Sequence, residues 1–559
     1  MDRNPLKLLW NRSIPICVMS NPSEQTISPS RFLRRILRER GIPEIEELRF
    51  LRASLSDLSD PFEIPAMEEA CYLLRNASSR NIPICIYADG DVDGISSAAM
   101  LARSLQRAGS LFDVRFTSRL ESYEIDSSYI KNLKQKGFGL LVLLDTGTSS
   151  CEALETCQDI SLPVILVDHH VPSKPLPEKV VSLNPHAGHA PSRMKQLSSA
   201  GLSFLFVRAL EGLLPAPAEK EDRAFLELAA MGTLNDYSSL TGDNRIIVKH
   251  GLRSLRFPSL PGLRLFRKSF YVPSHVDAVE PVTFFLNPKL NTPGRFGNPE
   301  TSFSLLMLDD GEDGSEYIKT IERLEKEKSR LLKKATAAAE RIDYRGKPPL
   351  AYVEGIPVSF SGTIAARLSD RAKLPAAAII PDGDSFQGSA RGHGLVDLFA
   401  HFSSNRDIFL SFGGHRNAVG FKLKQEKKVE LEELWDSLEG SFFSPLPEPD
   451  PWDLSLEDLD TDFLHEFEML KPFGSGNPEM LFTAGPVSVN ATDRTVSGCS
   501  VGWVRQNKKS SLFEALFPDR SRPVPSVISK LVYTPRTRSL GDGLFTVQLL
   551  VRDYSAGVE

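Results

Sequence analysis

The chain has 559 residues, which excludes a single hydrophobic core and predicts three or four domains. Hydrophobic residues make up 41% and charged residues 25%, as in ordinary soluble globular proteins, and no stretch approaches the ~20 uninterrupted apolar residues of a membrane-spanning helix. The net charge of -6 argues against a large basic nucleic-acid surface over the whole chain, although it leaves room for a local one.

The cysteines and the first residues indicate a cellular compartment. The six cysteines are scattered, with neither a disulfide framework nor a CxxC metal spacing. Residues 1–20 lack a basic leader followed by an apolar core. We therefore expect a cytoplasmic protein with no membrane association.

Residues 1–58 are expected to form an N-terminal extension. Residues 30–41 form a basic amphipathic pattern that ends at Gly41, a typical helix stop. The arginines of this helix form either a solvated face, which the pattern favours, or a phosphate-contacting patch.

From residue 59 to residue 314, strand patterns alternate with helix patterns, which predicts a mostly parallel sheet with helices on both faces. The first helix is expected from Met67 to Arg75. Three short apolar strands, at residues 81–87, 138–144 and 162–167, each run into acidic or imidazole side chains. These side chains are Asp89, Asp91 and Asp93 after the first strand, Asp145 after the second, and Asp168, His169 and His170 after the third.

The carboxyl ends of parallel strands share one edge of a sheet, so these side chains are expected to form one site. A helix-like stretch, residues 229–236, delivers a further carboxylate, Asp236. Oxygen and nitrogen ligands without clustered thiolates suit Mn²⁺ or Mg²⁺ better than a structural Zn²⁺. At the third strand at most two of the three polar residues can reach a common metal; a polar strand end without a ligand is the alternative.

The alternating aspartates at 89, 91 and 93 are expected to point to one side of an extended backbone and to share cations. An EF-hand loop also repeats Asp at a spacing of two. That alternative fails because the twelfth position is Met100, where the loop requires a bidentate Glu. Arg119, which lies between two of the site-forming strands, is either a surface charge or a phosphate ligand.

Residues 315–342 contain no Gly or Pro and are rich in Glu, Lys and Ala, which predicts a long connecting helix. A second α/β module is expected at 343–440. Its Gly413-Gly414-His415 turn either brings backbone N–H groups close to an anion or is merely a tight turn. A Pro- and acid-rich linker is expected at 441–470.

Residues 471–559 contain short alternating strands and an excess of basic residues. Four aromatic residues there are candidates either for base stacking or for the core of a small barrel, with the core favoured for most of them: Trp503, Phe513, Phe517 and Tyr533.

Several short motifs occur in an order that resembles the DHH phosphoesterase superfamily, and within it the exonucleases of single-stranded DNA. They lie at residues 89–94, 144–147, 167–170, 232–236, 288–295, 388–391, 412–420 and 472–478, and the similarity covers nearly the whole chain beyond about residue 50. The resemblance implies an α/β fold: a parallel-sheet DHH domain (59–314), a connecting helix, a second α/β DHH-associated domain and a C-terminal OB-fold β-barrel. It also implies a metal-dependent 5′-to-3′ exonuclease that degrades single-stranded DNA in DNA repair and recombination.

The resemblance also implies roles for individual residues. Two Mn²⁺ or Mg²⁺ ions would be held by Asp89, Asp91, Asp93, Asp145, His169 and Asp236, with Asp145 the best candidate for the bridge. Asp168 would orient a ligand, and His170 would contact the phosphate or protonate the leaving oxygen. Arg119, Ser389 and Arg391 would hold the 5′-phosphate of the DNA. The DNA strand next to that phosphate would contact Asn291, Arg295 and the turn formed by Gly413, Gly414 and His415. A monomer is expected, with a single-strand-binding protein as a candidate partner.

The chain departs from the usual pattern of these exonucleases at residues 122–124, at Lys289 and at residues 356–361. These departures leave the end preference and the substrate length open. Two alternatives remain: a DHH phosphodiesterase acting on short oligonucleotides or cyclic dinucleotides, and a non-catalytic DNA-binding scaffold. The long chain with its basic C-terminal module disfavours the first, and the intact ligand motifs disfavour the second.

Overall fold

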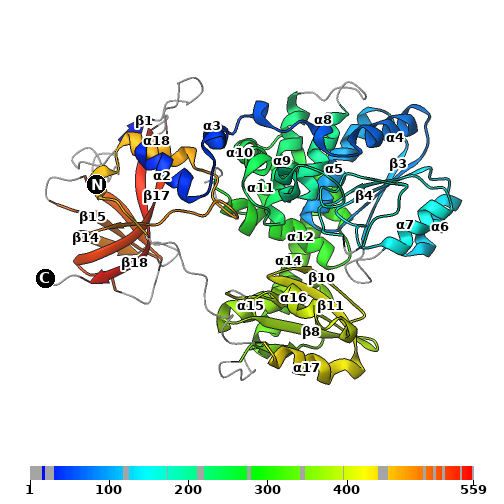
Figure 1. Cartoon of the computed structure of the whole chain (residues 1–559). Helices are drawn as coiled ribbons and strands as arrows, with labels where there is room; N and C mark the ends of the chain where they lie inside the picture. The colour runs from blue at the N-terminus through cyan, green and yellow to red at the C-terminus, as the bar shows by residue number, and fades with distance from the viewer. Residues whose placement is uncertain are drawn as a thin grey trace. The chain divides into compact units, whose positions relative to one another are not determined.

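The computed structural model describes residues 16–18, 30–117, 125–172, 174–210, 219–272, 278–339, 347–394, 396–438, 451–494, 499–507, 511–518, 523–541 and 544–556. The chain forms two compact units (Figure 1). One unit is Leu55–Pro447, and the other joins Met1–Ser54 to Glu448–Glu559. Among the described helices, none is both long enough and apolar enough to cross a bilayer.

The Leu55–Pro447 unit begins with a five-stranded parallel sheet. In spatial order its strands are β3 (Phe112–Phe116), β2 (Ile84–Ala88), β4 (Leu140–Leu144), β5 (Val164–Val167) and β6 (Val180–Ser182). The chain passes from β2 to β3 on one side and then to β4 on the other. The carboxyl ends of β2 and β4 therefore form the switch point at which open α/β sheets bind ligands.

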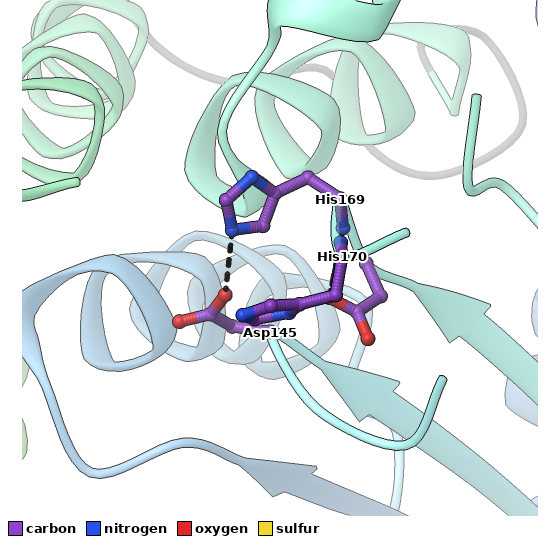
Figure 2. A group of neighbouring side chains, drawn as sticks. Asp145, His169 and His170 are labelled. Atoms are coloured by element: carbon purple, nitrogen blue, oxygen red, sulfur yellow. Dashed lines mark hydrogen bonds and ion pairs between the residues drawn. The ribbon is translucent and has the colours of Figure 1, made fainter. Parts of the chain in front are cut away.

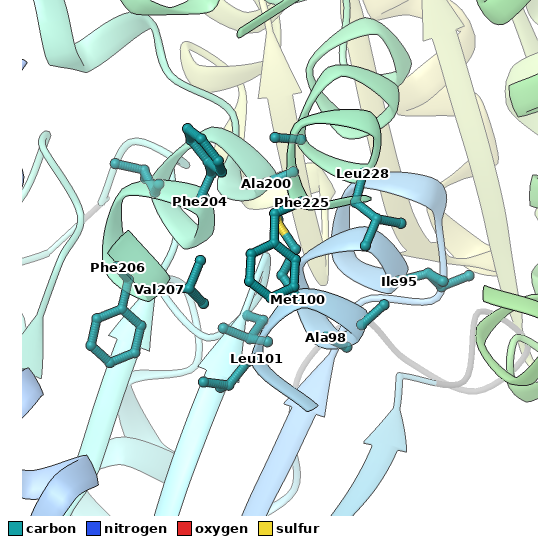
Figure 3. Packing of buried hydrophobic residues seen from close by; sticks show 14 of the residues in the cluster. Ile95, Ala98, Met100, Leu101, Ala200, Phe204, Phe206, Val207, Phe225 and Leu228 are labelled. Carbon is teal, nitrogen blue, oxygen red and sulfur yellow. The ribbon is translucent and has the colours of Figure 1, made fainter. Parts of the chain in front are cut away.

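Alternate residues of each strand enter two different cores. Leu140, Val142 and Leu144 face a large core, whereas Leu141 and Leu143 face a smaller one. The large core is completed by α4 (Met67–Ser79), α5 (Val92–Arg107), α8 (Ser199–Ala209) and α9 (Glu219–Asn235), and the smaller core by α6 (Ser127–Gln135) and α7 (Cys151–Asp159). Figure 3 shows side chains of α5, α8 and α9 meeting in the large core. The sheet with helices on both faces is thus confirmed.

The helices that follow extend the large core and lead to the second module. They are α10 (Gly242–Leu255), α11 (Pro261–Ser269), a π-helical turn (Pro281–Leu286) that continues into α12 (Asn287–Arg295), α13 (Glu300–Met307) and α14 (Ser315–Ala339). Ile318 and Ile321 of α14 are buried in the large core, and Leu331 and Leu332 are buried in the core of the second module. The predicted long connecting helix is therefore present, and it is anchored at both ends.

The second module is a mixed five-stranded sheet. Its order is β10 (Ser411–His415), β11 (Ala418–Lys424), β9 (Ser385–Arg391), β8 (Ala376–Asp382) and β7 (Leu350–Tyr352); only β7 and β8 are parallel. Helix α15 (Ser361–Ala372) covers one face together with α14. Helices α16 (Leu398–Ser403) and α17 (Lys428–Asp436) cover the other.

The other unit is built on a closed five-stranded barrel. Its strands are β14 (Val487–Arg494), β15 (Ser500–Arg505), β16 (Phe513–Phe517), β18 (Leu544–Ala556) and β17 (Val527–Gly541), and β17 closes the ring by pairing with β14. Only the β16–β18 pair is parallel within this ring. Strands β1 (Ile16–Val18), β12 (Trp452–Asp453) and β13 (Phe482–Ala484) extend the sheet beyond it. The expected OB-fold barrel is confirmed.

The structure differs from the expected N-terminal extension and linker. Helix α2 (Arg31–Glu39) forms as predicted: the Ser30 hydroxyl accepts a hydrogen bond from the Leu33 N–H (3.2 Å), and Gly41 ends the helix with a φ of 69°. Its apolar face, however, is buried in the barrel unit, where α3 (Glu47–Arg52) also lies. The described part of the expected linker forms β12 and α18 (Thr461–Met469) of the same core. Composition alone misses such a role because the apolar partners are supplied by distant segments.

Candidate metal centre

Asp89, Asp145 and Asp168 follow three neighbouring strands of the parallel sheet, β2, β4 and β5, which are in register. Hydrogen bonds between the strands continue past their ends, because the Asp145 N–H donates to the Val167 carbonyl (3.0 Å). Asp145 has a φ of 60°, a left-handed backbone that is uncommon outside glycine and that concentrates at functional sites. The switch point of the sheet therefore carries a row of carboxylates.

The ligand atoms of this edge gather into three overlapping groups. Within each group the atoms lie within 4.8 Å of one another, and the groups are Asp89–Asp91–Asp145, Asp93–His169–Asp236 and Asp145–Asp168–His169–His170. His169 Nε2 lies 3.6 Å from Asp145 Oδ1 (Figure 2). It also lies 3.4 Å from Asp236 Oδ2. Asp236 reaches the site because it directly follows α9. All six predicted metal ligands are thus brought together.

The carboxylates of this cluster repel one another in a buried environment. Burial, and then the charges of Asp93, Asp91, Asp89 and Asp236, raise the pKa of Asp145 well above its ordinary value. Burial and the charge of Asp91 raise the pKa of Asp236 to about 7. Such a cluster favours divalent cations, because a bound cation removes the repulsion.

Asp168 organises the third strand end. Its Oδ1 accepts hydrogen bonds from the backbone N–H of His169 (2.8 Å) and lies 2.7 Å from His170 Nδ1, and its Oδ2 accepts from the Thr148 N–H (3.1 Å). Burial opposes charge on both partners, but their mutual attraction prevails: the pKa of Asp168 falls well below its ordinary value and that of His170 rises to about 9. Asp168 therefore links the His170 ring to the backbone of Thr148 and His169.

The loop after β2 is not extended as far as predicted. Helix α5 begins at Val92, and Asp91 caps it by accepting hydrogen bonds from the N–H groups of Asp93 (2.8 Å) and Gly94 (3.3 Å). Asp93 is therefore a helical residue, and the argument from strand alternation was wrong for it. Its carboxylate accepts hydrogen bonds from the Ser199 (3.0 Å) and Ala200 (2.9 Å) N–H groups at the start of α8.

Three further residues support the site and were not predicted: Thr117 and Ser199 bond its carboxylates, and Asn184 bonds Thr148 and His170. Thr117, just beyond β3, donates its hydroxyl to Asp89 Oδ1 (2.6 Å). The Ser199 hydroxyl donates to Asp145 Oδ1 (2.9 Å). The Asn184 side-chain amide donates to the Thr148 hydroxyl (3.0 Å) and to the His170 carbonyl (2.8 Å). A threonine, a serine and an asparagine far from the acidic motifs carry no distinctive sequence signal.

Asn291 and Arg295 of α12 contact protein groups instead of lying free. Asn291 Oδ1 accepts a hydrogen bond from the Val92 N–H (2.8 Å), and its Nδ2 donates to Asn235 Oδ1 (2.6 Å). Arg295 Nη1 donates to the Ser359 carbonyl (2.7 Å), and the Ser359 hydroxyl donates to the Arg295 carbonyl (2.5 Å). Asn291 thus lies beside the metal cluster, and Arg295 links α12 to the second module.

The predicted end-binding residues lie on adjacent strands of the second module. Ser389 and Arg391 alternate on β9 and therefore share one face. Gly413, Gly414 and His415, which were expected to form a turn, are the last residues of strand β10. Gly420 of β11 pairs with both Ser389 and Gly413, so these glycines lie on the same part of the sheet. Ser361 Oγ lies 3.0 Å from Ser389 Oγ, and a Cβ at Gly362 would lie 2.6 Å from Arg391 Nη2. A side chain at position 362 would therefore displace the end of the flexible Arg391 side chain.

Three of the predicted features lie wholly or partly outside the residues that the structure describes. Arg119 and the departure at residues 122–124 fall in 118–124, outside the described residues. The backbone of Gly414 and His415 is described as part of β10, but the His415 side chain is not.

Comparison with known proteins defines the class first. Residues 83–233 match the DHH family, N-terminal domain, and this range contains most of the carboxylates and both histidines of the metal cluster. Residues 83–233 of this chain therefore form a DHH-family domain.

Within that family the chain is similar to RecJ proteins. It is 32% identical over 457 residues to the single-stranded-DNA-specific exonuclease RecJ of Bacillus subtilis. This alignment covers 79% of this chain and 57% of that protein. RecJ of Thermus thermophilus is 28% identical over 439 residues, and the alignment covers 76% of this chain and 63% of that protein. RecJ of Escherichia coli is 26% identical over 485 residues, and the alignment covers 80% of this chain and 82% of that protein. The chain thus spans less than two thirds of the length of the first two relatives.

Solved structures agree on the fold. The crystal structure of Thermus thermophilus RecJ in complex with Mn²⁺ matches with a TM-score of 0.74 at 22% identity, covering 94% of this chain and 76% of that chain. An exonuclease RecJ bound to manganese matches with a TM-score of 0.55 at 25% identity, covering 69% of this chain and 96% of that chain.

Proposed function

We propose that this protein is a metal-dependent exonuclease that degrades single-stranded DNA in the 5′-to-3′ direction, in DNA repair and recombination. The observation that carries the proposal is the gathering of six ligands from three strand ends and one helix end into overlapping groups. The RecJ relatives, which are named single-stranded-DNA-specific exonucleases, support the substrate class.

The residues present fit two divalent cations. The donor set is carboxylate oxygen and imidazole nitrogen without thiolate, which suits Mn²⁺ or Mg²⁺. Asp89, Asp91, Asp93, Asp145, His169 and Asp236 would hold the ions. Asp145 and His169 each belong to two of the three groups, and Asp145 is the one of the two that has a carboxylate able to bridge. When bound, the ions would supply an activated water and neutralise charge on the phosphoryl oxygens.

His170 is suited to act on the phosphate itself. Its side chain is 50% exposed, and in the metal-free protein the lowering effect of burial is outweighed by the charge of Asp168, which raises the pKa of His170 to about 9. Asp168 fixes the ring through Nδ1, which leaves Nε2 as the donor toward a phosphoryl or leaving oxygen. Asp168 thus sets both the orientation and the charge of His170.

Recognition of the strand end is assigned to the second module. Ser389 and Arg391, together with Arg119, would hold the 5′-phosphate, because a guanidinium fork and a hydroxyl match phosphate oxygens. Arg295 and the end of β10 at Gly413, Gly414 and His415 would contact the DNA strand nearby. Fixing the terminal phosphate fixes which phosphodiester reaches the metal centre.

The barrel unit would hold the strand beyond the site. Of its four candidate stacking aromatics, Phe513, Phe517 and Tyr533 are buried in the barrel core, as the pattern favoured, and Trp503 is half-buried. Trp503, together with the exposed Lys530 and Arg552, is therefore the part of this surface best suited to bind single-stranded DNA. We propose that the protein acts as a cytoplasmic monomer, with a single-strand-binding protein as a candidate partner.

One assay tests the proposal. The protein is incubated with end-labelled single strands, duplexes and dinucleotides, including cyclic ones, in Mn²⁺, in Mg²⁺ and in chelator. We expect metal-dependent release of mononucleotides from the 5′ end of single strands. Cleavage of dinucleotides alone would favour the phosphodiesterase alternative, and DNA binding without any cleavage would favour the scaffold.

A further inference from the structure

Helix α12 contacts two of the segments that bring carboxylates to the metal centre: the end of α9 and the turn after β2. Asn287 and Asn291 are one turn apart and share a face of the helix. Asn287 Nδ2 donates a hydrogen bond to the Met231 carbonyl (2.8 Å), and Asn291 Nδ2 donates to Asn235 Oδ1 (2.6 Å). Both acceptors belong to α9, and Asn235 immediately precedes Asp236.

The same face of α12 lies on the turn that carries Asp89 and Asp91. Asn291 Oδ1 accepts a hydrogen bond from the N–H of Val92, the residue after Asp91 (2.8 Å). One turn further along, Gly294 lies so close to this loop that an added Cβ would be 2.2 Å from the Gly90 carbonyl oxygen. Any side chain at 294 would therefore push α12 away from the loop.

We propose that Asn291 is a positioning residue for the metal centre: its amide links the Asp89–Asp91 turn to the residue beside Asp236. This inference rests on the proposed function, since it concerns the same cations. The two linked segments carry like charges that repel until a cation binds. A neutral amide links them without adding charge, and only a group that both donates and accepts can make both hydrogen bonds.

This role differs from the strand contact that the sequence predicted for Asn291. Both ends of its amide already bond to protein groups, and the side chain is half-buried. A DNA contact would have to use the second hydrogen of Nδ2 or the second lone pair of Oδ1. Groups that orient metal ligands typically change metal affinity about 10- to 100-fold when removed.

The experiment uses the full chain and the variants Asn291→Ala, Asn235→Ala, the double variant and Thr292→Val. Thr292 is the matched control, because its hydroxyl donates to the Pro288 carbonyl (2.9 Å) and bonds Glu325 and Lys328 but contacts neither ligand segment. Calorimetry measures the Kd of Mn²⁺, and fluorescence anisotropy in chelator measures the Kd of a single-stranded oligonucleotide.

We expect Asn291→Ala to weaken Mn²⁺ binding about 10-fold and to leave oligonucleotide binding unchanged. Asn235→Ala should weaken Mn²⁺ binding in the same direction, and the double variant should be no worse than Asn291→Ala, because both remove one shared bond. Thr292→Val should change neither Kd.

The opposite pattern would overturn the inference: weaker oligonucleotide binding with unchanged Mn²⁺ affinity in Asn291→Ala. If Asn291→Ala does not fold, Asn235→Ala decides alone, since Asn235 is half-buried at a helix end. A wild-type protein that binds Mn²⁺ but cleaves no DNA would contradict the proposed function and leave the metal-binding comparison intact.

Discussion

Asp145 is the residue at which burial, an unusual backbone and charge repulsion coincide. Asp145→Asn keeps the acceptor for the Ser199 hydroxyl and removes a like charge. We expect the metal-free variant to melt about 2–4 °C higher for each 1 kcal/mol of repulsion relieved. We also expect it to lose metal-dependent cleavage, and a variant that still cleaves would contradict the assignment. Thermal melting in chelator and the exonuclease assay measure the two effects.

The raised pKa of Asp236 predicts how the free energy of unfolding depends on pH. Its pKa is about 7 in the folded protein and 3.8 in the reference state, so the folded state binds more protons between these values. Stability of the metal-free protein should therefore fall as pH rises from about 4 to 7 and level off above 7. Urea unfolding at several pH values in chelator tests this. Asp236→Asn should reduce the slope, and an unchanged slope in this variant would rule out Asp236 as its source.

The sequence predicted the ligand residues but not all of the groups that position them. Asp89, Asp145 and His169 follow recognisable strands, so their meeting at one edge could be inferred from order alone. Thr117 and Ser199 could not be found this way, because hydroxyl residues are common and their partners lie 28 and 54 residues away. Asp93 was found for the wrong reason, since the helix starts one residue before it.

At the scale of elements, β9 presents Ser389 and Arg391 beside the start of α15. Charge-assisted hydrogen bonds contribute about 1.5–3 kcal/mol, so Arg391→Ala should reduce the preference for a 5′-phosphorylated end roughly 10- to 100-fold. Competition between 5′-phosphate and 5′-hydroxyl oligonucleotides measures this preference. A loss of activity that is equal for both ends would contradict the end-binding role.

Helix α2 shows where an element-scale prediction falls short. The pattern at 30–41 predicted the helix and its exposed arginines, but not its partners. Ser30 bonds Glu466, which is 436 residues away, and Leu33 is fully buried in the barrel core. No local pattern carries such a pairing.

Leu33→Ala tests the role of α2 in the barrel unit. Loss of a fully buried leucine should destabilise that unit by about 2–5 kcal/mol. Urea unfolding followed by Trp fluorescence measures the change, because Trp452 and Trp503 lie in this unit. Arg34→Ala is the control, since Arg34 lies on the exposed face of α2. Equal stability of the two variants would show that α2 is not part of the core.

At the scale of the whole molecule, α14 joins the sheet that carries the ligands to the module that carries Ser389 and Arg391. Arg295 and Ser359 add a reciprocal pair of hydrogen bonds between the same two parts. The order of the domains could be predicted because the hydrophobic pattern of the sequence changes from one domain to the next. Their attachments could not, because single polar contacts across the fold leave no such pattern.

The most direct test of the metal centre is anomalous diffraction from crystals of the protein soaked in Mn²⁺. We expect two manganese peaks among Asp89, Asp91, Asp93, Asp145, His169 and Asp236, with Asp145 between them. Peaks elsewhere, or no peak among these residues at saturating Mn²⁺, would contradict this expectation.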